Sequence, residues 1–140
     1  MRLLCVADNI APLVYSATVK ERFRDVDLVV GAGDLPMDYL GFIASSLNKP
    51  VLFVFGNHNL NHMHLFRNSG SPGPEMNRHP ADLAEQGFGS TYIDCRVKRA
   101  KGLIFAGLGG SLRYNKGDNQ FSEMQMYFRM FGMIPGLLWN

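Results

Sequence analysis

The chain has 140 residues, of which 46% are hydrophobic and 19% charged, and its formal net charge is +2 with histidine neutral. This length and composition argue against a disordered chain and indicate one domain that buries about two-thirds of its unfolded surface. The basic residues are dispersed, and the densest basic run, residues 98–101, resembles a solvated hairpin turn between two strand-like segments. No nucleic-acid partner is therefore indicated.

Membrane and secretory classes are also disfavoured. No apolar stretch is long enough to span a bilayer, and the N-terminus enters a strand-like segment without a signal-peptide pattern. Cys5 and Cys95 fall in apparent strands, where we expect them to be buried as small hydrophobic groups and not paired as a disulfide. The sequence thus predicts a cytoplasmic protein with no membrane partner.

Three apolar segments near the N-terminus each run directly into a cluster of polar residues. Residues 3–6 precede Asp8, residues 28–30 precede Gly-Ala-Gly-Asp34, and residues 51–55 precede Gly-Asn57-His58-Asn. Continuous apolar runs are typical of parallel strands that are buried on both faces. We expect parallel strands near residues 2–7, 27–31, 51–55 and 102–106, in an α/β fold whose mostly parallel sheet is flanked by helices.

Two stretches of helical length separate these strands. Residues 12–24 are expected to form the first helix, with Leu13, Ala17, Val19 and Phe23 facing inward. Residues 36–47 are expected to form the second, because proline suits a first helical turn and the apolar residues keep helical spacing.

The second half of the chain has weaker patterns. Residues 68–74 form an evident loop, and residues 91–98 alternate as a half-exposed strand does. A glycine-rich turn follows at residues 107–111. Ser122 and Gln125 match a capping box that opens a helix extending to Phe131, and the methionines of that region are expected to pack in the core.

The polar clusters suggest a metal site, because the carboxyl ends of parallel strands meet at one edge of the sheet, where α/β folds bind ligands. Asp8 and Asp34 supply carboxylates and Asn57 an amide oxygen, which are donors that hard divalent cations accept. His58 can point toward a phosphoryl oxygen or a leaving group. Two ions about 3.5–4 Å apart at such a site would clamp an in-line phosphoryl displacement.

The order of these clusters resembles the first three blocks of the calcineurin-like metallophosphoesterase superfamily, D-x-H, G-D and G-N-H-D/E. The resemblance implies a layered metallophosphoesterase-like fold, a single domain over residues 1–140 and hydrolysis of a phosphomonoester or phosphodiester by a metal-activated water. It implies Asp8, Asp34 and Asn57 as ligands of two divalent ions (Mn, Fe, Zn or Mg), with Asp34 bridging, and His58 as the catalytic histidine. The run at residues 107–111 followed by Arg113-Tyr114 resembles a bacterial branch of the family, and we expect Arg113 to bind substrate.

The chain departs from the family pattern at two places. Ile10 stands where the first block has histidine, and Asn59 replaces the usual acidic residue after His58. The family's two later histidine blocks have no counterpart before Asn140, and residues 130–140 are apolar to the end. We therefore expect a truncated domain, with a missing C-terminal segment or a partner chain covering residues 130–140, and weak or no activity for the chain alone.

Other interpretations remain open. The same fold with ligands lost can serve as a catalytically impaired scaffold or a protein-interaction module. His58 and His62 have the spacing of an H-x-x-x-H zinc helix, but Asn59 stands where the general-base glutamate belongs. The glycines at 31 and 33 lack the third glycine of a dinucleotide-binding loop. The sequence does not determine the phosphoester substrate, the metal or the oligomeric state.

Overall fold

A parallel four-stranded sheet forms the centre of the protein. The computed structural model describes residues 1–58, 60–67 and 89–139. The strands are β1 (Leu3–Ala7), β2 (Leu28–Ala32), β3 (Val51–Phe53) and β4 (Ser90–Tyr92), in the order β1-β2-β3-β4. Leu3 is paired with Leu28, Val29 with Val51, and Val51 with Ser90. This confirms the prediction of a mixed α/β protein with a parallel sheet.

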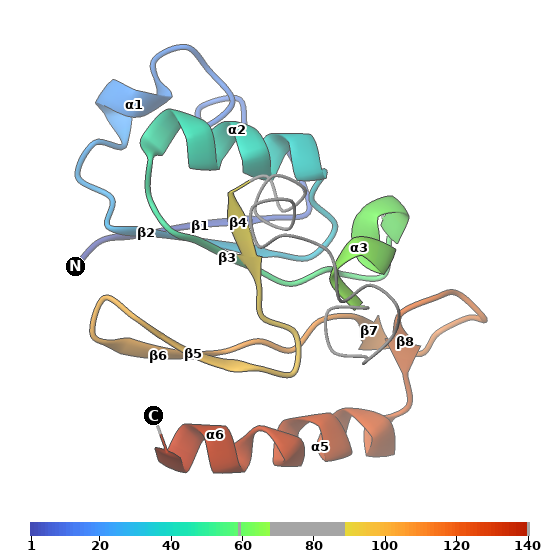
Figure 1. Cartoon of the computed structure of the whole chain (residues 1–140). Coiled ribbons are helices and arrows are strands. Elements are labelled where there is room, and N and C mark those ends of the chain that lie inside the picture. Colours follow the sequence, from blue (N-terminus) through green and yellow to red (C-terminus); the bar gives the residue numbers. More distant parts are fainter. Residues whose placement is uncertain (59, 68–88, 140) are drawn as a thin grey trace, which may run out of the picture.

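The helices α1 (Val19–Arg22) and α2 (Met37–Leu47) cover one face of this sheet (Figure 1). The larger hydrophobic core lies between them and the strands, and it includes Val6, Val29, Tyr39, Ile43 and Phe53. The 3₁₀ turn η1 (Leu60–His62) and the helix α3 (Met63–Arg67) follow β3, and Met63 and Phe66 extend the same core. Of the four apolar positions with helical spacing in α2, Leu40, Ile43 and Leu47 are buried as expected and Ala44 is half-buried.

The opposite face of the sheet is covered by a β-hairpin made of β5 (Val97–Ala100) and β6 (Leu103–Ala106). Ala100 and Phe105 of this hairpin pack against a second, smaller core of Leu28, Leu52 and Ile93. Figure 1 shows the helices α5 (Glu123–Gly132) and α6 (Ile134–Trp139) beyond the hairpin, on the side away from the sheet. The short strands β7 (Ser111–Leu112) and β8 (Gln120–Phe121) connect the hairpin to α5.

The prediction that residues 102–106 form a parallel strand of the sheet is wrong. This segment is β6, which pairs antiparallel with β5 in a separate two-stranded sheet, and β4 takes the fourth place in the parallel sheet. Lys101 (φ 50°) and Gly102 (φ 82°) form the two-residue connection. Two successive positive φ angles are typical of the tight hairpin turns that match the strand twist.

The strand predicted over residues 91–98 is interrupted in its middle. β4 ends at Tyr92, Cys95 adopts a positive φ of 51°, and β5 begins at Val97. Asp94 instead forms an isolated bridge with Gly107. The alternation in the sequence therefore belongs to two strands in different sheets.

The helix predicted over residues 12–24 is reduced to the single turn α1. The hydroxyl of Ser16 donates to the carbonyl oxygen of Leu13, a local bond that competes with helical backbone bonding. Leu13 and Ala17 are exposed, whereas Val14 is buried in the position expected for Leu13. Val19 and Phe23 pack inward as predicted.

The capping box at the start of α5 is confirmed. The Ser122 hydroxyl accepts from the backbone N–H of Gln125, and the Gln125 side chain accepts from the backbone N–H of Ser122. The expected core packing of the methionines is mostly wrong, because Met124 and Met130 are exposed and Met133 is buried.

The expectation that both cysteines are buried is also wrong. Cys5 is exposed on the edge strand β1, and Cys95 is exposed in the turn after β4. Among the described residues, no helix has the length and apolarity that crossing a membrane requires. The loop predicted at residues 68–74 lies outside the described residues.

Candidate metal centre

The structure brings the three polar clusters together at the carboxyl edge of the sheet. Asp8 follows β1 in a left-handed conformation (φ 54°), where the Asn9 N–H donates to the Ala7 carbonyl oxygen at 2.5 Å. The Oδ1 atom of Asp8 accepts a hydrogen bond from the backbone N–H of Asp34 at 3.3 Å. The first two predicted ligands are therefore in direct contact.

Asp34 is in turn joined to the third cluster. Its Oδ1 atom accepts from the backbone N–H of His58 at 2.6 Å. The backbone segments that follow β2 and β3 are also bonded to each other, because the Gly56 N–H donates to the Gly33 carbonyl oxygen at 3.1 Å. Asp34 thus contacts the Asp8 side chain on one side and the backbone at His58 on the other.

Two glycines make this approach possible. A Cβ atom on Gly33 would collide with the Asp8 carboxylate, and one on Gly56 would collide with the Asp34 carboxylate. Gly33 also has a φ of +87°, which side-chain-bearing residues rarely adopt. The pattern Gly33-Asp34 after β2 and Gly56-Asn57-His58 after β3 is therefore required by close packing of backbone against carboxylate.

Asn57 and His58 share one further partner, Tyr114. The Asn57 Nδ2 atom donates to the Tyr114 hydroxyl oxygen at 2.7 Å, and the same hydroxyl lies 3.2 Å from His58 Nε2. Because Nδ2 faces Tyr114, the amide oxygen of Asn57 is the atom turned away from it. We did not predict Tyr114 as a site residue, and its place beside Arg113 was the only signal for it.

The loop between β7 and β8 carries Tyr114 and is held by buried amide side chains. Gln120 Oε1 accepts from the backbone N–H groups of Tyr114 and Asn115, both at 3.2 Å. Asn119 Nδ2 donates to the Gly56 carbonyl oxygen at 2.5 Å, one residue before Asn57. Asn119 and Gln120 are each only 7% exposed. This loop is therefore anchored directly to the backbone of the candidate site.

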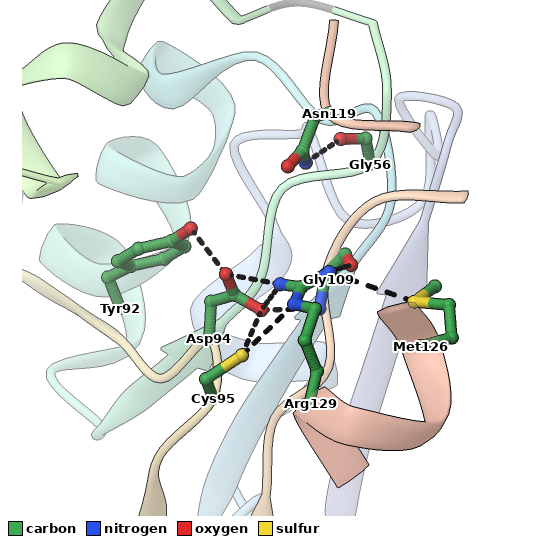
Figure 2. Close-up of polar contacts among 8 residues, drawn as sticks. All are labelled: Gly56, Tyr92, Asp94, Cys95, Gly109, Asn119, Met126 and Arg129. Carbon is green, nitrogen blue, oxygen red and sulfur yellow. Dashed lines mark hydrogen bonds and ion pairs between the residues drawn. The ribbon is translucent and has the colours of Figure 1, made fainter. Parts of the chain in front are cut away.

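A buried ion pair supports the same region from the other side (Figure 2). Arg129 of α5 contacts both carboxylate oxygens of Asp94 through Nη2, at 2.6 and 2.7 Å. Asp94 also accepts from the Gly109 N–H at 2.7 Å, and Arg129 Nη1 donates to the Gly109 carbonyl oxygen at 2.9 Å. The next residue, Gly110, donates its N–H to the Phe55 carbonyl oxygen at 2.8 Å. The glycine-rich turn thus links α5 to the end of β3.

The remaining predicted residues have less defined places. Arg113 directly precedes Tyr114 in the chain and is exposed. Its backbone N–H donates to the Phe121 carbonyl oxygen at 2.9 Å. Ile10 is exposed close to Asp8 in sequence. Of the other three histidines in the sequence, His62 lies on η1, His64 lies on α3, and His79 falls outside the described residues.

The donor chemistry of the site fits a hard divalent cation. Asp8 and Asp34 supply carboxylates and Asn57 an amide oxygen, which are the oxygen ligands that Mg²⁺ and Mn²⁺ prefer. Within residues 1–58, 60–67 and 89–139, no group of three or more His, Cys, Asp or Glu side chains could hold a metal ion. The binding of both ions stays a prediction.

Comparison of the chain with protein-family models, with curated proteins and with solved structures gave no match.

Proposed function

We propose that the protein is a metal-dependent phosphoesterase of the metallophosphoesterase type that hydrolyses a small phosphomonoester or phosphodiester. The observation that carries this proposal is the continuous contact from Asp8 through Asp34 to His58 at the carboxyl edge of the sheet. Support comes from three segments that are far apart in sequence and are joined here by bonds from the backbone N–H groups of Asp34 and His58 to the Asp8 and Asp34 carboxylates. That combination of hard ligands with one adjacent proton donor suits phosphoryl transfer.

Each side chain has a definite role in this proposal. Asp8, Asp34 and Asn57 would hold two divalent ions, with Asp34, which contacts both flanking clusters, as the shared ligand. Such ions would supply Lewis-acid polarisation of a phosphoryl oxygen and lower the pKa of the attacking water. His58 donates a proton to the leaving group, and Arg113 at the exposed side of the loop attracts the phosphate charge.

The role of Asp34 as a metal ligand is tested by removing its negative charge. We expect Asp34→Asn to abolish Mn²⁺ binding, measured by calorimetric titration, and with it the Mn²⁺-dependent hydrolysis of aryl phosphate mono- and diesters. Asp38→Asn is the matched control, because Asp38 is exposed on α2 and outside the site. If the unaltered chain fails to bind Mn²⁺, Mg²⁺ and Zn²⁺, or if Asp34→Asn binds them as well as Asp38→Asn does, the proposal is wrong.

The histidine is tested separately from the ligands. His58→Ala is expected to retain bound metal and to slow turnover by roughly 10²–10⁴, the range of general acid–base catalysis. The loss should shrink for aryl phosphates whose phenol leaves without protonation. Loss of metal in His58→Ala would instead identify the imidazole as a ligand.

A second function is favoured by a different observation. The helices α5 and α6 expose large apolar side chains on their outer sides, including Phe128, Phe131, Leu138 and Trp139. Exposed apolar surface of this extent is typical of interaction sites. A catalytically impaired scaffold that binds another protein through α5 and α6 would show this surface without metal-dependent turnover.

A further inference from the structure

The hydroxyl of Tyr114 contacts both Asn57 and His58 through their side chains. It accepts from Asn57 Nδ2 at 2.7 Å and lies 3.2 Å from His58 Nε2. The two contacted residues are adjacent in the chain, and Tyr114 reaches them from the loop between β7 and β8. A proposed metal ligand and a proposed acid therefore share one hydrogen-bonding partner.

Counting donors and acceptors fixes the direction of the bond to Asn57. An amide nitrogen can only donate, so the Tyr114 oxygen is an acceptor toward Asn57. The phenolic proton then remains available for donation, and we take His58 Nε2, 3.2 Å from the hydroxyl oxygen, as its partner. If Nε2 accepts, the proton of the neutral imidazole resides on Nδ1.

The same count orients the amide of Asn57. Its nitrogen and oxygen occupy opposite sides of one planar group, so holding Nδ2 on Tyr114 turns Oδ1 away from Tyr114. Only Oδ1 can bind a cation. A flipped amide would present nitrogen to the metal and lose the ligand.

The placement of Tyr114 is built into the fold. Its backbone N–H is held by the buried Gln120, and the neighbouring Asn119 donates to the Gly56 carbonyl oxygen. Gly117 leaves the room that the Gln120 and Asn115 side chains occupy, because a Cβ there would lie 2.6 Å from Gln120 Nε2. The tyrosine residue itself is 62% exposed, so its hydroxyl contributes little to the stability of the fold.

We infer that Tyr114 is a positioning residue: its hydroxyl orients the Asn57 amide so that Oδ1 faces the metal, and fixes His58 in the Nδ1–H tautomer. The effects on metal affinity and on turnover rest on the proposed function. The hydrogen-bond arrangement does not, because it involves only side chains of the chain itself.

The arrangement is tested in the metal-free protein by the ¹⁵N chemical shifts of the His58 imidazole, measured at a pH where the ring is neutral. We expect Nε2 to show the shift of a hydrogen-bonded acceptor and Nδ1 that of a protonated nitrogen. Tyr114→Phe should change both shifts, whereas Tyr127→Phe should change neither. Tyr127 is the matched control because it is an exposed tyrosine on α5.

The consequence for the metal is tested by titrating Mn²⁺ into the same variants. Tyr114→Phe is expected to weaken Mn²⁺ binding by about 10–100-fold, the usual loss when the partner of a metal ligand is removed. In an Asn57→Ala background, Tyr114→Phe should cause no further loss, since the tyrosine acts through the amide. In a His58→Ala background it should likewise leave the remaining turnover unchanged, apart from the loss that follows from weaker metal binding.

The outcomes separate this inference from the proposed function. If no chain binds metal but the ¹⁵N shifts respond to Tyr114→Phe as expected, the phosphoesterase proposal fails and the positioning role of Tyr114 stands. Unchanged ¹⁵N shifts and unchanged Mn²⁺ affinity in Tyr114→Phe would overturn the inference while the unaltered chain still bound metal. Further loss of Mn²⁺ affinity in the Asn57→Ala background would overturn the action through Asn57.

Discussion

At the scale of single residues, the candidate site depends on how closely backbone approaches carboxylate. Gly33 and Gly56 lie so near to Asp8 and Asp34 that neither position has room for a Cβ atom. Each glycine therefore controls the position of a proposed metal ligand that belongs to a different strand. The steric effect of adding a Cβ atom at such a glycine can be separated from the backbone strain that the same substitution causes.

Gly33 and Gly102 provide this separation. Both have strongly positive φ, +87° and +82°, but a Cβ on Gly33 meets Asp8 whereas one on Gly102 meets nothing within 4 Å. Gly102→Ala is expected to cost about 1–2 kcal/mol through backbone strain alone and to leave metal binding unchanged. Gly33→Ala should cost more and should also lower Mn²⁺ affinity. Denaturant unfolding and metal titration of both variants measure the difference, and equal Mn²⁺ affinity would show that the Asp8 position tolerates the methyl group.

Tyr39 gives the protein a pH dependence outside the candidate site. Burial raises the pKa of its phenol above the usual 10.0, and the hydrogen bond from the Ala11 N–H lowers it by a smaller amount. The proton is held more tightly in the folded chain. Its contribution to stability is therefore complete below about pH 10 and is lost as pH rises through the raised pKa.

We expect the ultraviolet absorbance of tyrosinate to show one tyrosine that ionises later than the others and only together with unfolding. In Tyr39→Phe that late step should disappear. This variant should also lose about 0.5–1.5 kcal/mol at neutral pH through the missing hydrogen bond. A late step that persists in Tyr39→Phe would assign it to another tyrosine.

At the scale of elements, the main contact between α5 and the rest of the protein is polar and not apolar. No residue of α5 is buried, yet Arg129 forms a two-oxygen ion pair with Asp94 and lies 3.8 Å from the Phe121 ring centroid. The same pair fixes Gly109, whose neighbour Gly110 donates its N–H to the carbonyl oxygen of Phe55, two residues beyond β3. The ion pair therefore connects α5 to the segment that leads into Asn57 and His58.

Arg129→Met is expected to destabilise the protein by about 3 kcal/mol, because it leaves Asp94 with a largely buried, unpaired charge. The pair is not fully enclosed, since its side chains are 15% and 13% exposed, so we take the lower end of the usual range. Arg2→Met is the control. It breaks the Arg2–Asp25 pair, whose side chains are 71% and 58% exposed, and should cost less than about 1 kcal/mol.

Urea unfolding measures both variants, and hydrogen exchange of the α5 amides shows whether this helix opens first in Arg129→Met. Equal losses in the two variants would mean that the Asp94–Arg129 pair contributes no more than a surface pair. The double variant Asp94→Asn/Arg129→Met should recover part of the loss, because it removes both charges.

At the scale of the whole molecule, the inner layers are covered on both sides, whereas the outermost layer exposes large apolar side chains. The sheet has α1 and α2 on one face and the β5–β6 hairpin on the other, and the outermost layer is formed by α5 and α6 (Figure 1). Leu138 is 81% and Phe128 69% exposed in this outer layer. Apolar side chains at such positions add nothing to the core of a single chain.

Phe128→Lys and Leu138→Lys are therefore expected to change the free energy of unfolding by no more than about 0.5 kcal/mol, as is usual for surface positions. Both should reduce the binding of a hydrophobic dye to the native protein. Val29→Lys, in the centre of the sheet, is the contrasting variant and should prevent folding. A loss of several kcal/mol in Leu138→Lys would show that this side chain is covered in solution.

The sequence by itself determined the local order of the site and part of the fold. Runs of apolar residues identified β1, β2 and β3, although β1 lies at the edge of the sheet and only its Val6 is buried. The polar residues after these runs were predicted to meet because parallel strands end at one edge. Proline and helical spacing identified α2, and the Ser122–Gln125 pair identified the start of α5. These features depend on short-range chemistry, which a sequence displays directly.

Only the tertiary structure decided the rest. Residues 103–106 are as apolar as β3, and nothing local distinguishes a strand in the parallel sheet from one in a separate hairpin that packs on the sheet face. The Asp94–Arg129 pair and the bonds of Tyr114 to Asn57 and His58 join residues 35 to 57 positions apart. Such contacts depend on where the chain returns in space, so the partner that orients the candidate site emerges only once the fold is known.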